Sequence, residues 1–368
     1  MGLLFPFALI GGTIAFLYGT PFLIPFIVIL YISAGFYFTI KFFALKKQKK
    51  IIYRILGVTI ALSLIYTIPG IYGKTRATVQ DGYIETYSYA PFSKTSKVVS
   101  LTEPSTYKIK DDLPIIDGAT ALYPIYSAFA KAVYPEKEYD QYDSEVMSTR
   151  TDEAYNKLIN GEVDMIFVLS PSESQLKRAK NKGLELKLTP IGKEAFVFFV
   201  NAKNPVTNLT TDEVKGIYSG EITNWKEVGG KDKSIRAFQR PEDSGSQTAL
   251  QQFMGEVPIM DPPVEDIASL MGTILDQVSD YKNYNNAIGY TFRYYSTEMT
   301  KNKRIRLLSL NDVEPTIETI RSGTYPITGE FYAITAGSEN PHLDEFIAWI
   351  LSEQGQEIIE KTGYVSIQ

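Results

Sequence analysis

Apolar side chains dominate the N-terminal part of the chain. Residues 3–41 form an almost unbroken apolar run that carries no charge before its last residue. This run is too long for one membrane span of about 20 residues and suits two, with a break near residues 19–21. Residues 51–72 form a third run, interrupted only by Arg54 near its start. The pattern predicts a helical membrane anchor of about three spans over residues 1–73.

Basic residues predict the orientation of this anchor. The loop at residues 46–50 is Lys-Lys-Gln-Lys-Lys, and by the positive-inside rule it is cytoplasmic. Two spans before the loop place the N-terminus inside, and the third span carries everything after Lys74 outside. A cleaved signal peptide fits less well, because no basic segment precedes the first apolar run. An anchor of two spans, with the first apolar segment lying at the membrane interface, is an alternative. It would place the C-terminal part of the chain on the other side of the membrane.

The rest of the chain changes pattern twice. Residues 74–112 are polar and rich in Tyr and Ser, with short alternating pieces at residues 97–101 and 107–109. They predict a membrane-proximal connector with one or two edge strands. From residue 113 to residue 368, short apolar strands alternate with helical patterns, which indicates an α/β fold with largely parallel sheets. Strands are expected at 114–116, 163–169, 195–201 and 235–238, and helices at 121–133, 152–160, 172–182, 211–219 and 247–254.

Composition narrows the classes of function. The 368 residues leave room for more than one core, and the net charge of −5 without a basic stripe argues against nucleic-acid binding. The chain has no Cys, which excludes disulfides, thiolate catalysis and Cys-ligated metals. Its single histidine, His342, stands at a helix start and is expected to be a surface or capping residue. We therefore expect a binding protein without a metal or cofactor, rather than an enzyme.

The segment with the clearest chemistry follows the expected strand at 235–238. It reads Arg240-Pro241-Glu242-Asp243-Ser244-Gly245-Ser246-Gln247-Thr248 and opens a helix. Helix N-termini present unpaired N–H groups and a partial positive charge, so anions bind there. Glycine lets the backbone approach a ligand, and the arginine fork matches tetrahedral oxoanions. The segment predicts an oxoanion site.

Two further loop-to-helix junctions carry hydroxyl groups. One is Gly118-Ala119-Thr120, and the other is Ser148-Thr149-Arg150-Thr151. A single Ser or Thr before a helix is usually only an N-cap. Three such junctions in one α/β unit, one of them with an arginine, favour a shared anion site.

Other motifs accompany these junctions in a fixed order. They are Asp117-Gly118-Ala119-Thr120, Asn160-Gly161-Glu162-Val163-Asp164, Phe196-Val197-Phe198-Phe199-Val200-Asn201, Ile217-Tyr218-Ser219-Gly220-Glu221-Ile222-Thr223-Asn224-Trp225, Ala287-Ile288-Gly289-Tyr290, Tyr325-Pro326-Ile327 and Gly363-Tyr364-Val365. Through them, residues 113–368 resemble the phosphate-binding proteins of ABC phosphate importers, in the type II periplasmic-binding-protein superfamily. The resemblance implies two α/β lobes joined by a strand hinge, lobe I at about 113–195 and 291–368 and lobe II at about 196–290.

The resemblance also implies which residues bind an oxoanion between the lobes. Arg240 would supply the guanidinium, held by an ion pair with Glu242. The remaining ligands would be hydroxyl and amide groups of Thr120, Ala121, Thr151 (or Thr149 if the loop shifts), Ser244, Gly245 and Ser246. Many oriented neutral dipoles can replace the water shell of a desolvated anion.

One position departs from the family pattern. Family members often carry an aspartate after the strand at 163–169, where it accepts the proton of hydrogen phosphate, and here the ungapped position is Leu169. Ser170 or Glu173 would replace it only after a shift in alignment. The membrane anchor is a second departure. The sequence thus predicts a membrane-tethered, extracytoplasmic protein that captures phosphate or a similar oxoanion and passes it to an ABC permease. A phosphate-sensing surface domain, or a structural or adhesive surface protein with a degenerate cleft, stays open as an alternative.

Overall fold

The computed structural model describes residues 86–261, 285–299 and 305–367, together with residues 54, 57, 58, 78, 79, 281 and 282. The chain divides into two units, Met1–Ala77 and Thr78–Gln368. The predicted membrane spans and Lys-rich loop lie in the first unit and, apart from three isolated positions, outside the described residues. Within the part of the chain that is described, no helix combines the length and apolarity needed to cross a membrane.

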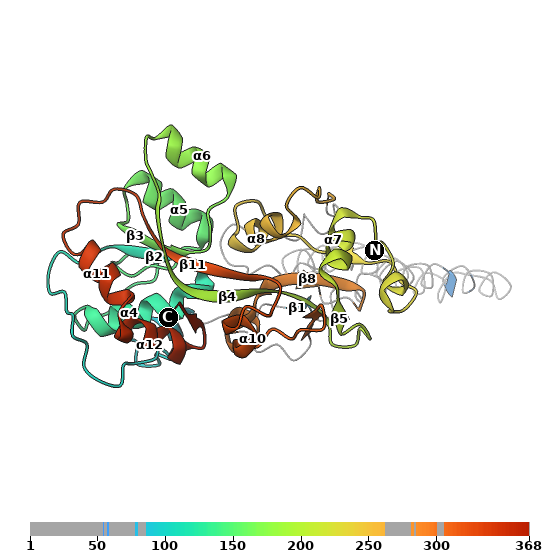
Figure 1. The fold of residues 1–368 in the computed structure, drawn as a ribbon, viewed down its shortest axis with the longest axis horizontal. Helices are drawn as coiled ribbons and strands as arrows, with labels where there is room; N and C mark the ends of the chain where they lie inside the picture. The colour runs from blue at the N-terminus through green and yellow to red at the C-terminus, as the bar shows by residue number, and fades with distance from the viewer. Residues whose placement is uncertain are drawn as a thin grey trace, which may run out of the picture. The chain divides into compact units, whose positions relative to one another are not determined.

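One long strand organises the second unit (Figure 1). Strand β4 (Lys187–Asn201) pairs through its first half with β11 (Thr328–Thr335) and through its second half with β8 (Ala287–Phe292). Beyond these neighbours the sheet continues to β2 (Ile116–Gly118) and β3 (Met165–Val168) on one side and to β6 (Arg236–Ala237) on the other. The short strands β9 (Ile305–Leu307) and β12 (Val365–Ser366) also pair with β4.

Among the described residues, two large hydrophobic cores form along this sheet, beside a small cluster of Phe199, Phe238 and Ala287. We call the two halves of the unit the first and second lobes. The first core joins strands β2, β3 and β11 to helices, with Phe129, Phe167 and Trp349 among its buried residues. Its lobe contains η2 (Thr86–Tyr89), η3 (Thr120–Leu122), α4 (Tyr123–Val133), α5 (Thr151–Asn160), α6 (Glu173–Asn181), η5 (Tyr295–Met299), α11 (Leu343–Ile350) and α12 (Glu353–Thr362).

The second core gathers around the other half of β4. Phe198, Tyr218, Trp225 and Tyr290 are buried there. The rings of Phe198, Tyr218 and Tyr290 pack against one another edge to face or tilted. Its elements are β5 (Asn208–Leu209), α7 (Thr211–Ser219), η4 (Trp225–Val228), α8 (Gly245–Met254), β10 (Ser309–Leu310) and α10 (Ile317–Arg321). A separate two-residue pairing joins β1 (Thr78–Val79) to β7 (Tyr281–Lys282).

The mixed α/β class and the two lobes are as predicted, but the prediction of largely parallel sheets is wrong. Only β2 with β3, β6 with β8 and β5 with β10 are parallel among the described pairings. The pairings of β4 with β8, β9, β11 and β12 are all antiparallel. The reason is that β4 carries the chain from the first lobe to the second, and the strands beside it run in the opposite direction.

The connector at residues 86–112 also differs from expectation. No strand forms at residues 97–101 or 107–109, because their backbone groups find other partners. The Lys97 N–H donates to the Ser88 carbonyl (2.7 Å) and the Ile109 N–H to the Val133 carbonyl (3.0 Å). Between the two ranges, Thr102 donates through both its N–H and its hydroxyl to Glu357 of α12 (2.9 and 2.6 Å). Val98 and Ile109 are buried in the first core. This segment is therefore packed onto the first lobe.

Candidate anion-binding site

Helix α8 begins with a polar first turn. Ser244 is its N-cap and accepts a hydrogen bond from the Gln247 N–H (3.3 Å). Gly245 and Ser246 are the first helical residues, whose N–H groups have no acceptor within a helix. No acidic residue occupies the first turn of α8, so no side chain within that turn neutralises the positive end of the helix dipole. The predicted residues Ser244, Gly245 and Ser246 thus form one polar helix start.

Two buried side chains that the sequence analysis did not select fix the Arg240 loop. The Arg240 N–H donates to Gln247 Oε1 (3.0 Å) and to the Tyr290 hydroxyl (2.8 Å). The Tyr290 hydroxyl in turn donates to Gln247 Oε1. Tyr290 belongs to β8 and Gln247 to α8, so the loop is attached to both elements. Arg240 is half-buried and Glu242 is exposed.

The first lobe meets this helix start through α5. A Cβ atom added to Gly245 would lie 3.2 Å from Thr151 Oγ1 and 3.6 Å from Leu169 Cδ1. Thr151 is the first residue of α5, and its N-cap, Arg150, makes no side-chain capping bond. Arg150 also has φ 79°, a backbone conformation that is costly for a residue other than glycine and is often found at ligand sites. Two helix N-termini from different lobes therefore meet at Gly245.

Thr149, the alternative ligand if the loop shifts, faces Asp117. Its N–H donates to Asp117 Oδ1 (2.8 Å) and its hydroxyl to Asp117 Oδ2 (2.5 Å). Asp117 is fully buried, also accepts from the Gly118 N–H (2.7 Å), and lies 3.8 Å from Lys157 Nζ. Burial raises the pKa of Asp117, against the lowering effect of these hydrogen bonds and of Lys157. The Thr149 hydroxyl proton is thus committed to Asp117, and Thr151 is the better candidate ligand.

The loop-to-helix junction Gly118-Ala119-Thr120 follows β2. A Cβ atom on Gly118 would lie 2.3 Å from the Phe167 carbonyl oxygen, so only glycine allows this approach of β2 to β3. The chain then enters η3 at Thr120, which is half-buried, and the Ala121 carbonyl accepts from the Tyr364 hydroxyl (2.5 Å). Thr120, Ala121 and Arg240 stay predicted ligands, and Glu242 stays the predicted ion-pair partner of Arg240.

Leu169 occupies the position where the family pattern places a carboxylate. It follows β3, packs against both hydrophobic cores, and its carbonyl accepts from the Tyr155 hydroxyl (2.9 Å). Its side chain faces Gly245, as given above. Glu173, the alternative considered, is exposed on the first turn of α6. An apolar side chain therefore borders the start of α8.

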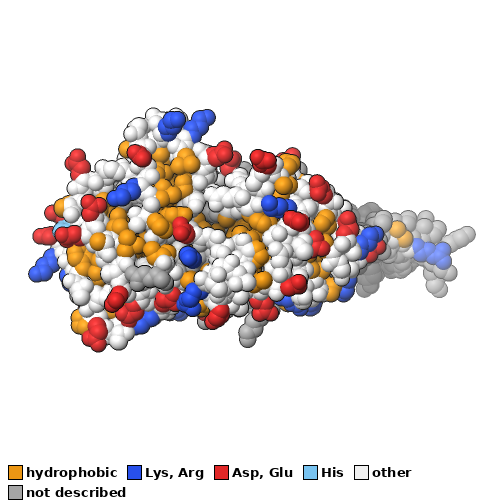
Figure 2. Space-filling view, in the orientation of Figure 1, with side chains coloured by type: hydrophobic (Ala, Val, Ile, Leu, Met, Phe, Trp, Pro, Cys, Tyr) orange, Lys and Arg blue, Asp and Glu red, His pale blue; other side chains and the backbone are white. Residues whose placement is uncertain are grey.

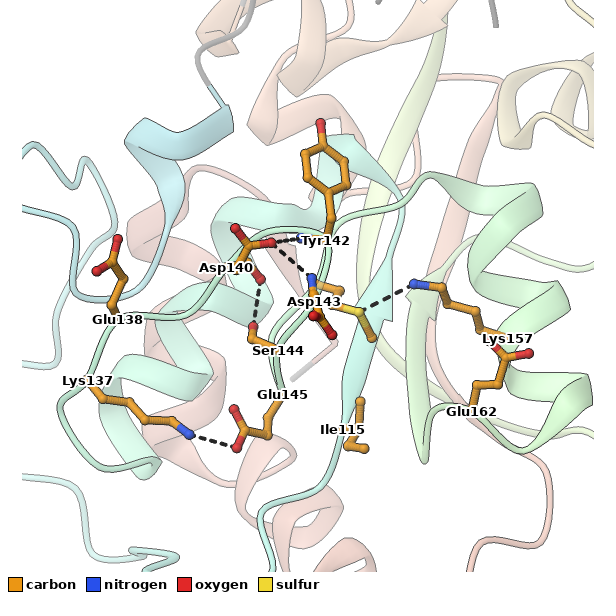
Figure 3. Close-up of a pocket in the computed structure, with 11 residues that line it drawn as sticks. Ile115, Lys137, Glu138, Asp140, Tyr142, Asp143, Ser144, Glu145, Lys157 and Glu162 are labelled. Atoms are coloured by element: carbon orange, nitrogen blue, oxygen red, sulfur yellow. Dashed lines mark hydrogen bonds and ion pairs between the residues drawn. The ribbon is translucent and has the colours of Figure 1, made fainter. Parts of the chain in front are cut away.

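A large cavity of about 820 Å³ lies elsewhere, on the first lobe. Figure 3 shows its loop, where Asp140 accepts from the Tyr142 and Asp143 N–H groups and Lys137 pairs with Glu145 (2.7 Å). Five of its eleven lining residues are acidic and two are basic, a balance that is unfavourable for an anion. Within the described ranges, no group of His, Asp and Glu side chains is arranged to hold a metal. On the face in Figure 2, acidic and basic side chains are interspersed.

Comparison with known proteins places the fold in a family. Residues 113–354 match the sequence model of a PBP superfamily domain. The chain belongs to the PBP superfamily. This confirms the resemblance inferred from the motifs, and it assigns the two lobes and their shared strand β4 to a PBP fold.

Individual relatives of this PBP-superfamily chain are distant in sequence. It is 26% identical to the phosphate-binding protein PstS of Borreliella burgdorferi over 69% of this chain and 89% of the relative. It is also 26% identical to PstS of Bacillus subtilis, over 68% and 80%. A solved structure from Clostridium perfringens, described as a phosphate ABC transporter substrate-binding protein with bound phosphate, has 24% identity and a TM-score of 0.52. That likeness covers 71% of this chain and all of the other, and it shows a shared fold.

Proposed function

We propose that this protein is an extracytoplasmic solute-binding protein that captures phosphate or a similar tetrahedral oxoanion for an ABC importer. The approach of Thr151 to Gly245 carries the proposal, because it brings the starts of α5 and α8 together from two lobes. Helix starts of this kind stabilise anions through their N–H groups and dipoles. The relatives named phosphate-binding proteins support phosphate as the first ligand to test.

The proposed ligands are mainly hydrogen-bond donors. Thr120, Thr151, Ser244 and Ser246 would supply hydroxyl groups, and Arg240 would supply a permanently charged fork that matches two oxygens of the anion. The backbone of Arg240 is held by Gln247 and Tyr290, which supports a fixed position for the loop. Glu242 would orient the guanidinium, and the amides of Ala121 and Gly245 would complete the shell.

We further propose that residues 1–73 tether the protein to the cell membrane through two or three spans. Residues 74–112 would form the connection to the anion-binding domain at residues 113–368, with lobe I at about 113–195 and 291–368 and lobe II at about 196–290. The apolar runs in the sequence support the tether. A permease in the same membrane would then receive the anion without release into bulk solvent.

Calorimetric titration of the purified protein with phosphate and with sulfate tests the proposal. Arg240→Ala should weaken anion binding about ten- to a hundred-fold, because a hydrogen bond to a charged group contributes roughly 1.5–3 kcal/mol. Arg321→Ala is the matched control, since Arg321 is on α10 and pairs with Glu360 (2.6 Å). Binding that is absent in the wild type, or unchanged in a folded Arg240→Ala protein, would refute the proposed site.

A further inference from the structure

The two lobes are also joined by a carboxylate. Asp243, which immediately precedes the N-cap of α8, projects its side chain to the N-terminus of α6 in the first lobe. Asp243 Oδ1 accepts from the hydroxyl groups of Ser172 (2.5 Å) and Ser174 (2.7 Å), and Oδ2 lies 2.7 Å from the Ser174 hydroxyl. Arg178 Nη2 approaches Oδ2 to 3.4 Å. The carboxylate thus lies at the N-terminus of α6, where the helix dipole favours a negative charge.

The groups that receive Asp243 are held in place by the first lobe. Ser172 is the N-cap of α6 and forms a reciprocal capping box with Gln175. Arg178 bonds at the same time to Asn156 (2.8 Å) and Asp152 (3.0 Å) of α5. Because these side chains are already ordered, little conformational entropy is lost when the carboxylate enters.

The second lobe presents Asp243 in an unusual backbone conformation. Its φ is 66°, in the left-handed region that costs energy for a residue with a Cβ atom but is tolerated by Asp and Asn. The Asp243 carbonyl also accepts from Gln175 Nε2 (3.3 Å), and the side chain is only 17% exposed. Both the carboxylate and the main chain of this residue therefore contact α6.

We propose that Asp243, Ser172, Ser174 and Arg178 form a latch that holds the two lobes closed without an anion between them. The latch is built from residues outside the proposed anion shell. Opening the lobes requires the carboxylate to leave the α6 terminus and to be hydrated again. Asp243 directly precedes Ser244, the N-cap of α8, so the latch adjoins the proposed anion site.

One consequence rests on the proposed function. An anion that contacts both lobes leaves only when they separate, so the latch slows anion release. Removing the latch should accelerate phosphate release, because the closed state loses contacts that are independent of the ligand. Asp243 would therefore affect anion release by holding the lobes together, without contacting the anion itself.

The distance between the lobes tests the latch directly. The chain contains no Cys, so Lys180→Cys on α6 and Gln252→Cys on α8, both exposed, provide two label sites in the full-length protein. Electron–electron resonance between spin labels would be measured after dialysis against anion-free buffer. The test variants are Asp243→Asn and Ser174→Ala, and Ser174→Thr is the matched control that keeps the hydroxyl.

The wild type and Ser174→Thr should give one short distance in the absence of anion. Asp243→Asn and Ser174→Ala should each lower the ratio of closed to open protein about ten-fold, which corresponds to about 1.4 kcal/mol. The double variant should open the lobes less than the two single effects combined would, because Ser174 acts through its contact with Asp243. An open wild type, unchanged distances in both test variants, or opening of Ser174→Thr equal to that of Ser174→Ala would overturn the latch.

Addition of inorganic phosphate separates the two proposals. Closure of the opened variants by phosphate supports the anion site and leaves the latch result unaffected. Lack of any response to phosphate in all variants would refute the proposed function, while the difference between Asp243→Asn and wild type in anion-free buffer would still establish the latch.

Discussion

Raising the pH through the neutral range is expected to destabilise the folded protein, because Glu194 is buried where β4 passes between the lobes. Glu194 is 4% exposed. Its Oε1 accepts from the Ala195 N–H (2.8 Å) and its Oε2 from the Tyr294 N–H (3.1 Å). Arg293 Nε lies 3.7 Å from Oε1. The side chain is thus enclosed between β4 and the segment that follows β8.

Burial raises the pKa of Glu194 from 4.5 to about 7, although Arg293 and the two hydrogen bonds act in the opposite direction. Below the pKa that Glu194 has in the unfolded chain, the folded and unfolded states both carry the proton, and the titration of Glu194 does not change the stability. Between the two pKa values the folded state keeps a proton that the unfolded state has lost, so stability falls as pH rises. The full loss is about 3 kcal/mol, at about 1.4 kcal/mol for each pKa unit.

Denaturant unfolding across pH of about 5 to about 8 measures this effect. Fluorescence reports both lobes, since Trp349 is in the first core and Trp225 in the second. Glu194→Gln removes the titration and also one acceptor, so it should lower stability overall while making the pH dependence shallower. Other titrating groups are common to both proteins and cancel in the difference. Parallel pH profiles for wild type and Glu194→Gln would refute the reasoning.

Three further outcomes are expected. Leu169→Asp should weaken sulfate binding at least ten-fold more than phosphate binding, because a carboxylate repels a fully ionised anion and accepts a hydrogen bond from a protonated one. Leu169→Asn is the control, and equal losses of sulfate and phosphate affinity in calorimetry would contradict this expectation. Gly245→Ala, whose Cβ would lie 3.2 Å from Thr151 Oγ1, should weaken anion binding while the melting temperature changes little; unchanged affinity would contradict the assigned site. A Cys at Lys94, an exposed position, should react with an impermeant reagent on intact cells, and protection would reverse the proposed topology.

Local signals explain which elements could be predicted from the sequence. Helix α7 was predicted with its observed bounds because Thr210 and Glu213 form a capping box and Gly220 ends the helix in the left-handed conformation. The predicted start of α8 differs from the observed start by only two residues, because Ser244 is a typical N-cap that marks a helix start in the sequence. Capping and apolar periodicity are encoded within a few residues and need no tertiary information.

The missed features depend on residues far apart in the chain. Strand β11 inserts between β3 and β4, and no local pattern indicates that it runs antiparallel to both. The contact between Asp243 and Ser172 joins two segments that look like independent helix starts. The Thr149 hydroxyl, the alternative to Thr151 if the loop shifts, donates to Asp117, a buried carboxylate in β2. Competition between nearby acceptors decides such cases, and it is visible only in three dimensions.

The place of β11 in the sheet has a consequence for biosynthesis. The first lobe is built from segments on both sides of the second in sequence, and β11, α11 and α12 are near the C-terminus. Until they emerge from the ribosome or cross a membrane, β3 and the first half of β4 lack the strand that joins them. Unpaired strand edges invite association with other chains. The second lobe can form most of its core earlier. The nascent chain would therefore pass through a stage in which the second lobe is folded while the first lobe still exposes unpaired strand edges.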